Sequence, residues 1–257
     1  MIVAKNLKKS FSGVLVLDDV SVTFEKGITN LIIGQSGSGK TVLLKCIVGL
    51  HDLDEGEIWF DGRLYNELSF KERKEIRKEI GMLFQGSALF DSSTVEENVR
   101  FPLDMFSDMT YQEKIDRVNF CLDRVNITNA NKLYPSELSG GMKKRVAIAR
   151  AISLNPKYLF CDEPNSGLDP QTGIVIDKLI SEITKEYNIT TVVNTHDMNS
   201  VIEMGEKVVF IYDGKKFWEG SNTEILETDL KELNEFVFAT SLAQKLKPRQ
   251  PIISHAK

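Results

Sequence analysis

The chain has 257 residues, of which 42% are hydrophobic and 27% are charged, and its formal net charge is −5. This balance excludes a wholly disordered protein, and the length is sufficient to bury a core without disulfide staples. The acidic balance gives no broad basic surface, so we expect no nucleic-acid partner. The three cysteines are scattered, and no signal-peptide core or membrane-spanning apolar run is apparent, so a cytosolic protein is expected.

The first third of the chain predicts strands. Residues 2–7 and 14–24 alternate or run apolar, and residues 28–33 form an almost fully apolar run, typical of a strand buried on both faces. A helix over 41–48 is predicted after the glycines that follow this run. The Asp-Gly pair at 61–62 predicts a tight turn between strands at 57–60 and 63–65.

The middle of the chain predicts helices. Ser69 with Glu72, and Thr110 with Glu113, have the spacing of capping boxes, in which two side chains satisfy the free N–H groups of a helix start. Residues 86–155 are therefore expected to form a mainly helical insert. After it, strands are predicted at 158–161, 190–194 and 208–212, with a helix over 171–187. This alternation indicates a parallel α/β sheet.

A glycine-rich loop follows the apolar run at 28–33. It fits the pattern G-x-x-x-x-G-K-[ST] and stands between a predicted strand and a predicted helix, as that motif requires. Glycines let backbone N–H groups turn toward phosphate oxygens, and the helix start adds its positive dipole end. We expect the lysine to reach the β- and γ-phosphates of ATP and the following threonine to ligate Mg²⁺. The expected ATP-binding residues of this loop are Gly34, Gln35, Ser36, Gly37, Ser38, Gly39, Lys40, Thr41 and Val42.

Two acidic residues end the predicted strand at 158–161. Asp162 is expected at the carboxyl edge of the sheet, where it can hold Mg²⁺, and Glu163 is expected to orient and polarise the attacking water. Alone, two acids at a strand end are more often merely solvated. Because they follow the phosphate loop, the catalytic interpretation is favoured.

The segment Leu138-Ser139-Gly140-Gly141-Met142 precedes a predicted helix, where exposed N–H groups form an anion site. At these residues the chain resembles the ATPase subunits of ATP-binding-cassette (ABC) transporters, whose signature is L-S-G-G-Q. The resemblance covers residues 2 to about 225. It implies an α/β fold with a P-loop NTPase core and parallel sheet, an antiparallel β subdomain and a helical subdomain over about 86–155. Residues 1–225 would form a single ATPase domain.

The resemblance also implies roles for residues outside these motifs. Phe11 matches the aromatic residue that stacks on adenine, and Gln85 matches a glutamine that contacts Mg²⁺ or the attacking water. Asp169 lies in the segment called the D-loop and is expected to contact nucleotide, and His196 matches the histidine that senses the γ-phosphate. Met142 departs from the family glutamine and removes one polar contact to nucleotide.

In the family, ATP lies between two copies. The phosphate loop with Lys40 comes from one subunit, and Ser139, Gly140 and Gly141 come from the other. Since this chain carries one copy of each motif, a homodimer is the expected state. The resemblance thus implies catalytic roles for Glu163, His196 and Lys40, and metal contacts from Thr41, Gln85 and Asp162.

Residues 84–90, 95–102 and 135–142 look most like the ATPases of Mla/Mce-type phospholipid-trafficking systems. That likeness implies an integral-membrane permease as partner, an Mce-domain substrate-binding protein and a small accessory subunit. The chain would then lie on the cytoplasmic face of the inner membrane. Alternatives are the ATPase of a lipoprotein-releasing, amino-acid or other small-solute system, and a non-transport ABC ATPase. A monomeric P-loop kinase would not explain the signature together with His196.

Three features stay open. Apolar residues after Gln85 are expected to divide between a groove for the permease and the core of the insert: Leu89, Phe90, Phe101, Leu103, Met105 and Phe106. His51 and His255 match no motif and are expected at the surface. Residues 226–257 predict a C-terminal helix and an extension, either a poorly ordered end or an arm that contacts a partner or the second copy.

Overall fold

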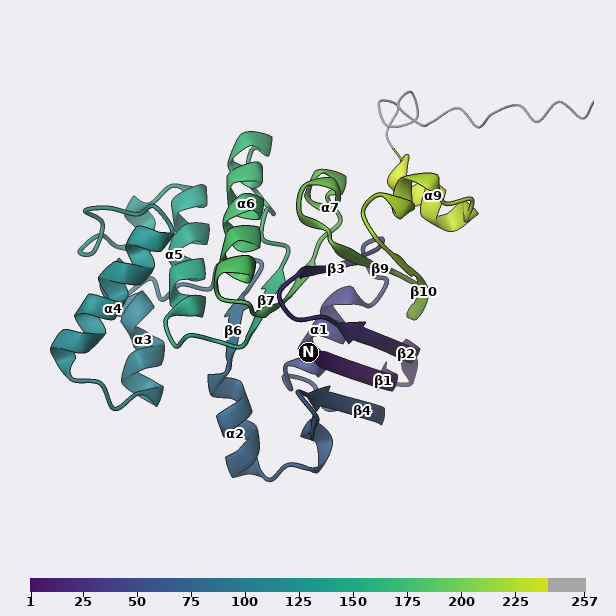
Figure 1. Ribbon diagram of the computed structural model, residues 1–257, viewed down its shortest axis with the longest axis horizontal. Coiled ribbons are helices and arrows are strands. Elements are labelled where there is room, and N and C mark those ends of the chain that lie inside the picture. Colours follow the sequence, from purple (N-terminus) through teal and green to yellow (C-terminus); the bar gives the residue numbers. More distant parts are fainter. Residues whose placement is uncertain (240–257) are drawn as a thin grey trace, which may run out of the picture.

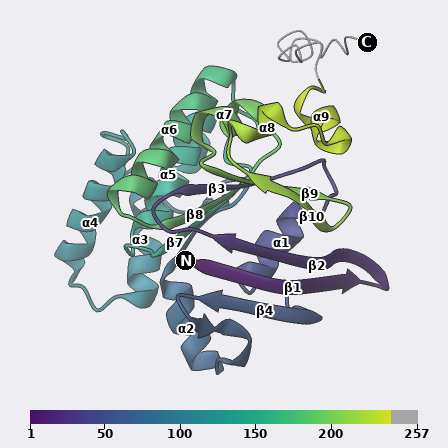
Figure 2. The ribbon, with the colours of Figure 1, turned by 45° about the vertical axis from the view of Figure 1, so that its right-hand side comes forward.

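The computed structural model describes residues 1–239, which form two sheets with helices packed around them (Figures 1 and 2). The smaller sheet is antiparallel, in the order β2-β1-β4-β5. The larger sheet has the order β10-β9-β3-β8-β7-β6 and is parallel from β9 to β6, with β10 antiparallel at its edge. This is the α/β fold class predicted from the sequence.

The strands of the smaller sheet are β1 (Ile2–Phe11), β2 (Val14–Phe24), β4 (Glu55–Phe60) and β5 (Arg63–Leu64). Those of the larger sheet are β3 (Thr29–Ile33), β6 (Ile80–Leu83), β7 (Tyr158–Asp162), β8 (Thr190–Asn194), β9 (Lys207–Tyr212) and β10 (Lys215–Gly220). Every residue of β3, β7 and β8 is buried, as the apolar runs predicted.

Alternating side chains of the central strands enter two different cores. Leu31 and Ile33 pack with α6 (Pro170–Glu186) and the helices of the insert, whereas Ile32 packs with α1 (Lys40–Ile47) and the antiparallel sheet. Successive side chains of a strand point to opposite faces, so one short strand anchors both layers. The phosphate loop that follows β3 is therefore held from both sides.

The insert contains α3 (Val95–Phe106), α4 (Tyr111–Arg124) and α5 (Gly140–Ile152), which gather on one side of the molecule in Figure 1. The predicted capping boxes are present at Ser69, before α2 (Phe70–Lys78), and at Thr110, before α4. A third, at Thr94, begins α3. Short 3-10 turns occupy Tyr65–Glu67 and Pro135–Glu137.

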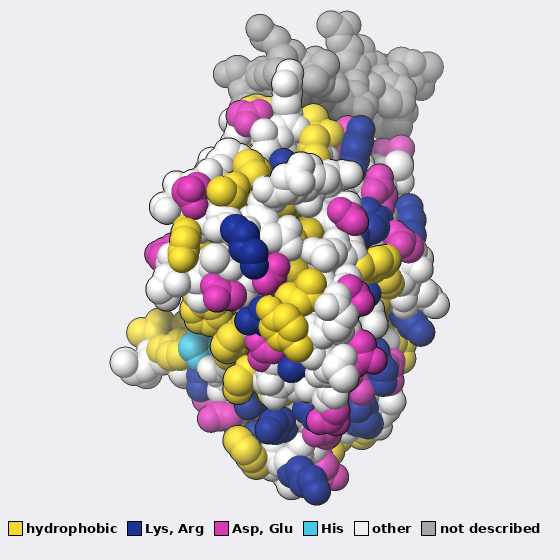
Figure 3. All heavy atoms as spheres, turned by 90° about the vertical axis from the view of Figure 1, so that its left-hand side faces the viewer, with side chains coloured by type: hydrophobic (Ala, Val, Ile, Leu, Met, Phe, Trp, Pro, Cys, Tyr) yellow, Lys and Arg dark blue, Asp and Glu magenta, His cyan; other side chains and the backbone are white. Residues whose placement is uncertain are grey.

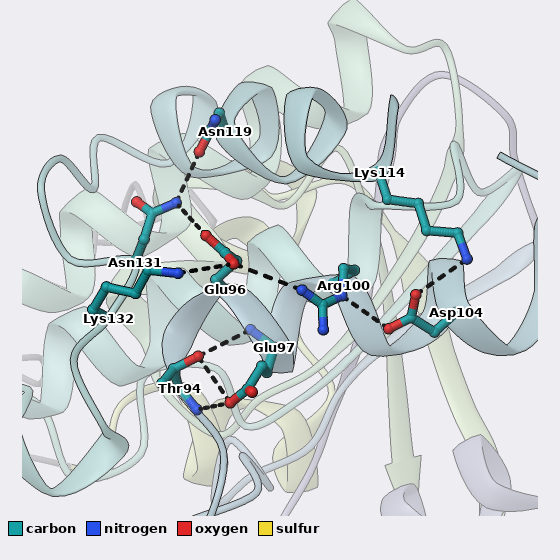
Figure 4. Close-up of polar contacts among 9 residues, drawn as sticks. All are labelled: Thr94, Glu96, Glu97, Arg100, Asp104, Lys114, Asn119, Asn131 and Lys132. Carbon is teal, nitrogen blue, oxygen red and sulfur yellow. Dashed lines mark hydrogen bonds and ion pairs between the residues drawn. The ribbon is translucent and has the colours of Figure 1, made fainter. Parts of the chain in front are cut away.

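A polar network centred on Glu96 of α3 holds the loop before the signature segment (Figure 4). The Glu96 side chain is 9% exposed and lies 3.6 Å from Arg100 and 3.2 Å from Lys132. Its backbone N–H donates to the carbonyl of Asn131 at 3.0 Å, and the Asn131 amide donates to its carboxylate at 3.3 Å. Residues 131–132 are thus fixed to α3 a few residues before the signature begins.

Some elements differ from the sequence prediction. The residues from Ser69 onward were expected to be helical, but Ile80–Leu83 form β6, which pairs with β7. Strand β10 and the helix α7 (Met198–Met204) were not predicted. In the C-terminal part, α8 (Glu224–Glu227) and α9 (Lys231–Val237) lie within the described residues, while residues 240–257 lie outside them.

The surface opposite the antiparallel sheet carries charges of both signs. Figure 3 shows Lys and Arg side chains interspersed with Asp and Glu on this face, with hydrophobic side chains in separate groups. Within residues 1–239, no helix is both long and apolar enough to cross a bilayer.

Candidate nucleotide-binding site

Parallel pairing brings four loops to one edge of the larger sheet. Strands β3, β8, β7 and β6 are neighbours, and their carboxyl ends lead into the segments that carry Gly34, His196, Glu163 and Gln85, respectively. In register, Asn194 of β8 stands opposite both Ile32 and Asp162. Ligands of open α/β sheets bind outside this edge, so the fold gathers the predicted residues where a nucleotide would lie.

The phosphate loop wraps around Lys40. The Lys40 side chain is buried, and its Nζ donates to the carbonyls of Gly34 and Gln35 at 2.8 and 2.9 Å. Gly39, at the start of α1, has φ 103°, and a Cβ there would lie 3.0 Å from the Val16 carbonyl. Gly37 has φ +83° and faces open space. Only glycine fits these positions readily.

The loop also contains a buried polar atom that lacks a partner. Ser38 Oγ has no hydrogen-bond partner within the described residues. A buried hydroxyl of this kind is expected to bond with a ligand. Together with the inward ammonium of Lys40, it fits the oxygen-rich, negatively charged phosphate chain of ATP.

Thr41 and Asp162 lie side by side beneath the loop. Thr41 Oγ1 donates to Asp162 Oδ1 at 3.2 Å, and Asn194 Nδ2 donates to the same oxygen at 3.1 Å. These hydroxyl and carboxylate oxygens suit Mg²⁺, which usually keeps waters and takes further ligands from substrate phosphates. Among residues 1–239, no group of three or more His, Cys, Asp or Glu residues could hold a metal alone. The donor set therefore fits Mg²⁺ bound together with a nucleotide.

Glu163 and His196 form a pair above Asp162. His196 Nδ1 lies 2.7 Å from Glu163 Oε2, with the Glu163 side chain 14% exposed and that of His196 58% exposed. Glu163 has φ 52°, and its N–H donates to the Asn194 carbonyl at 3.0 Å. A bulky residue in the left-handed region is held there by its surroundings. The carboxylate is thus oriented by the imidazole and by its own strained backbone.

Burial lowers the pKa of Lys40, and the negative charges of Glu163 and Asp162 act in the opposite direction. The ammonium is therefore desolvated and lies within the field of both carboxylates. Charged groups interact more strongly in such an environment than in water. Bound phosphates would replace the two loop carbonyls as partners of this ammonium.

The signature segment does not meet the phosphate loop of the same chain. Ser139 caps α5 by accepting from Met142 N–H at 3.2 Å. A Cβ on Gly141 would lie 2.6 Å from Thr172 at the start of α6. Within the described residues, no hydrogen bond joins residues 139–141 to residues 34–42. Among residues 1–239, the signature segment is therefore not bonded to the phosphate loop of its own chain.

Asp169 was predicted to contact nucleotide. In the structure it is the N-cap residue of α6. Its two carboxylate oxygens accept from the Thr172 N–H at 3.0 Å and from the Thr172 hydroxyl at 2.5 Å. Thr172 is the residue against which Gly141 packs, so the cap of α6 supports the signature segment.

Phe11 ends β1 with its side chain 39% exposed. His51 packs edge-on against this ring, with centroids 5.3 Å apart, and Lys9 Nζ lies 5.3 Å from the same ring centre. His51 is half-buried and so is partly at the surface, where it packs against the aromatic side chain. His255 lies outside the described residues.

The apolar residues after Gln85 divide into buried and exposed members. Leu103 is fully buried and Leu89 packs against the core, while the others are between 37% and 57% exposed: Phe90, Phe101, Met105 and Phe106. The Gln85 side chain itself is exposed. Leu103 and Leu89 thus belong to the core of the insert, and the groove for a permease stays a prediction for the exposed members.

Sequence reasoning missed two basic residues of α5 that hold the catalytic loops. Lys144 is 4% exposed, and its Nζ donates to the carbonyl of Gln85 and, at 3.4 Å, to that of Glu163. Arg150 donates to the carbonyls of Ser87 and Ala88 at 2.8 and 2.7 Å. Burial lowers the pKa of both side chains. The sequence could have indicated Lys144, because it has helical spacing with the apolar residues Ile148 and Ala151 and so lies on the buried face of α5.

Comparison with known proteins shows which family the chain belongs to. The family model described as "ABC transporter" matches residues 17–166. The dimeric bacterial ABC transporter cassette MJ0796 superposes with TM-score 0.79 at 34% identity, covering 86% of this chain and 99% of that one. CbiO1 from Clostridium perfringens, part of the cbiONQ complex, gives 0.82 at 29% identity, covering 96% and 98%. This chain belongs to the ABC transporter family, as an ATP-binding subunit that hydrolyses ATP.

Its curated relatives carry a more particular name. A methionine import ATP-binding protein, MetN, of Campylobacter jejuni is 41% identical over 253 residues, covering 92% of this chain and 75% of the relative. The MetN of Carboxydothermus hydrogenoformans is 40% identical over 260 residues, covering 100% and 76%. The phospholipid assignment and its Mce-domain partner find no support among these relatives, whereas the amino-acid alternative does. The resemblance at residues 84–90 and 135–142 did not identify the transported solute.

We predict that Lys144→Met lowers kcat for ATP hydrolysis about tenfold, because two carbonyls of the catalytic loops lose a buried donor at a cost of about 1–3 kcal/mol each. Steady-state ATPase assays measure this effect. Lys143→Met, a half-exposed neighbour on the same helix, is the matched control and should keep the wild-type rate. Equal rates in the two variants would contradict a role for Lys144.

Proposed function

We propose that the chain is the ATPase subunit of an ABC importer for methionine or a closely related amino acid. The observation that carries the proposal is the match of the whole chain, at 40% identity, to a methionine import ATP-binding protein. The residues needed for hydrolysis are present and gathered at one sheet edge, so the relatives' activity is chemically open to this chain.

In this proposal each site residue has a defined role. Lys40 moves from its loop carbonyls to the phosphate oxygens, and Phe11 offers its exposed ring to adenine. Thr41 and Asp162, with Gln85 from the neighbouring loop, would hold Mg²⁺, which neutralises charge on the β- and γ-phosphates when bound. Glu163 accepts a proton from the attacking water and holds that water in line.

His196 has a positioning and a sensing task. Its Nδ1 is engaged with Glu163 at 2.7 Å, so Nε2, on the other edge of the ring, is the atom left for the γ-phosphate. Bound triphosphate would then bridge His196 to Lys40 and align the catalytic carboxylate. Loss of the γ-phosphate would remove that alignment.

Two copies would complete the site. The N–H groups at the start of α5 form an anion site that, within the described residues, makes no hydrogen bond to the phosphate loop of its own chain. In a head-to-tail dimer, Ser139 and Gly141 of one copy would face the phosphates bound at Lys40 of the other. The dimeric state of the similar cassette MJ0796 supports this arrangement.

The apolar groove beside Gln85 is proposed to receive the permease. It has a volume of about 390 Å³, and Phe90 and Phe101 stack edge to face on its wall with centroids 4.8 Å apart. Arg150 lines the groove and also holds the backbone at Ser87 and Ala88, so a segment bound there would act on the loop of Gln85. The subunit would then work at the cytoplasmic face of the membrane.

We expect Lys40→Ala to abolish ATP binding, since it removes the buried ammonium of the phosphate loop.

Glu163→Gln should retain ATP binding and lose hydrolysis, because the amide keeps an oxygen for His196 and cannot accept the proton. Equilibrium binding of a fluorescent ATP analogue and phosphate release measure the two effects. Retained affinity in Lys40→Ala would show that the loop is not the phosphate cradle.

Transport is tested in cells that carry Glu163→Gln in place of the native residue. Uptake of radiolabelled methionine should fall at least about tenfold, because transport is coupled to hydrolysis. The matched control is Lys143→Met. Unchanged methionine uptake together with an altered distribution of phospholipid between the membranes would overturn the proposal.

A further inference from the structure

Asp177 is a buried carboxylate that the site described above does not use. It lies on α6 and is 1% exposed. Its Oδ1 accepts from Asn165 Nδ2 at 2.8 Å, and the same Nδ2 lies 3.0 Å from Ser200 Oγ. The Ser200 hydroxyl also lies close enough to the Asp177 carboxylate to lower its pKa. The three side chains therefore form a triangle in which Asp177 and Ser200 are buried and Asn165 is half-buried.

Each corner of the triangle belongs to a different segment of the catalytic edge. Asn165 follows Glu163 by two residues, in a turn closed by the bond from Ser166 N–H to the Glu163 carbonyl at 3.1 Å. Ser200 is on α7, four residues after His196. Helix α6, which carries Asp177, packs beside α7 (Figure 1). The triangle thus joins the loop of Glu163 to the helix that follows His196.

Movement at one corner of the triangle would change the position of Glu163. Glu163 is in a left-handed backbone conformation, and its loop has little freedom to move without changing that geometry. Asn165 lies against Gly173 of α6, where an added Cβ would be 3.5 Å from the Asn165 side chain. A shift of Asn165 away from Asp177 would therefore move the backbone that carries the Glu163 carboxylate.

A carboxylate at position 177 is not explained by packing, because burial disfavours its charged form. Burial raises the pKa of Asp177 to about 6, the charges of Asp197 and Glu203 act in the same direction, and the bonds from Ser200 and Asn165 oppose them. Replacing a buried charged group by an apolar one is often neutral or stabilising, so packing does not account for an acid here. Its neighbours on the helix, Ile176 and Ile180, already supply the apolar contacts.

We propose that Asp177 is a positioning residue for ATP hydrolysis: through Asn165 and Ser200 it keeps the Glu163 carboxylate and the His196 imidazole at hydrogen-bonding distance. The inference rests on the ATPase reaction and is independent of the transported solute. Because its side chain is buried, Asp177 acts through the two loops that it joins.

Two substitutions of similar size separate the carboxylate's hydrogen bonds from its volume. Asp177→Leu cannot accept from Asn165, and its kcat is expected to fall at least about tenfold while KM for ATP changes less than about twofold, since small misplacements of a catalytic group are costly. Asp177→Asn offers an oxygen to Asn165 and an N–H to Ser200, so it should retain kcat within about threefold.

A matched control is available on the same helix. The Thr184 hydroxyl is buried, donates to the Ile180 carbonyl at 2.7 Å and lies 2.6 Å from Thr191 Oγ1, far along α6 from the catalytic edge. Thr184→Val should lower the melting temperature and leave kcat unchanged. If Thr184→Val lost kcat as Asp177→Leu does, the loss would reflect general destabilisation and the inference would fail.

A second readout requires no turnover. The chain has three histidines, so the imidazole signals can be assigned by NMR in ¹³C-histidine-labelled protein. In Asp177→Leu, or in Asn165→Ala if the first variant does not fold, the His196 signal should shift while that of His51 stays in place; Asp177→Asn should retain the native signal. An unmoved His196 signal in a folded variant would overturn the inference, whatever solute the transporter carries.

Discussion

The register of the central parallel strands is the constraint on which the rest of the structure depends. Strands β3, β8 and β7 pair in parallel without a register shift. The residues that follow them, Gly34, His196 and Glu163, therefore lie at one edge of the sheet. These strands are buried on both faces, and their alternate side chains pack into two different cores. A shift of one residue in the strand pairing would move each side chain from one core to the other. The catalytic geometry is thus a consequence of burying Leu31, Ile32 and their neighbours.

The edge concentrates buried charge at a cost in stability. Lys40 and Lys144 are desolvated, Asp162 and Asp177 are almost fully covered, and each has hydrogen-bond partners in the backbone or side chains of a functional loop. Such groups are poor stabilisers but define one arrangement of the loops they bond. The α5 helix participates twice, since its start carries the signature and its buried face holds the loops of Gln85 and Glu163.

Sequence patterns predicted the strands that are apolar throughout, the capped helices and the residues of the phosphate loop, because these depend on local chemistry. They missed β6, whose short Ile80–Leu83 run becomes a strand only by pairing with β7, and they missed Lys144 and Asp177, whose partners are distant in sequence. The contact of His51 with Phe11 was also not predicted, because it joins separate segments. The phospholipid assignment found no support among the relatives, because the residues that the sequence singled out are those of a nucleotide site.

The central claim is that each ATP site is divided between two copies, and disulfide trapping tests it most directly. The cysteines at positions 46, 121 and 161 are free and buried, so they are not expected to form disulfides with other chains. A chain with Ser36→Cys and Ser139→Cys therefore reports only on disulfides between the two introduced cysteines. With ATP and a mild oxidant, the account predicts a covalent dimer on a non-reducing gel. A product of monomer size with a disulfide inside one chain would contradict it.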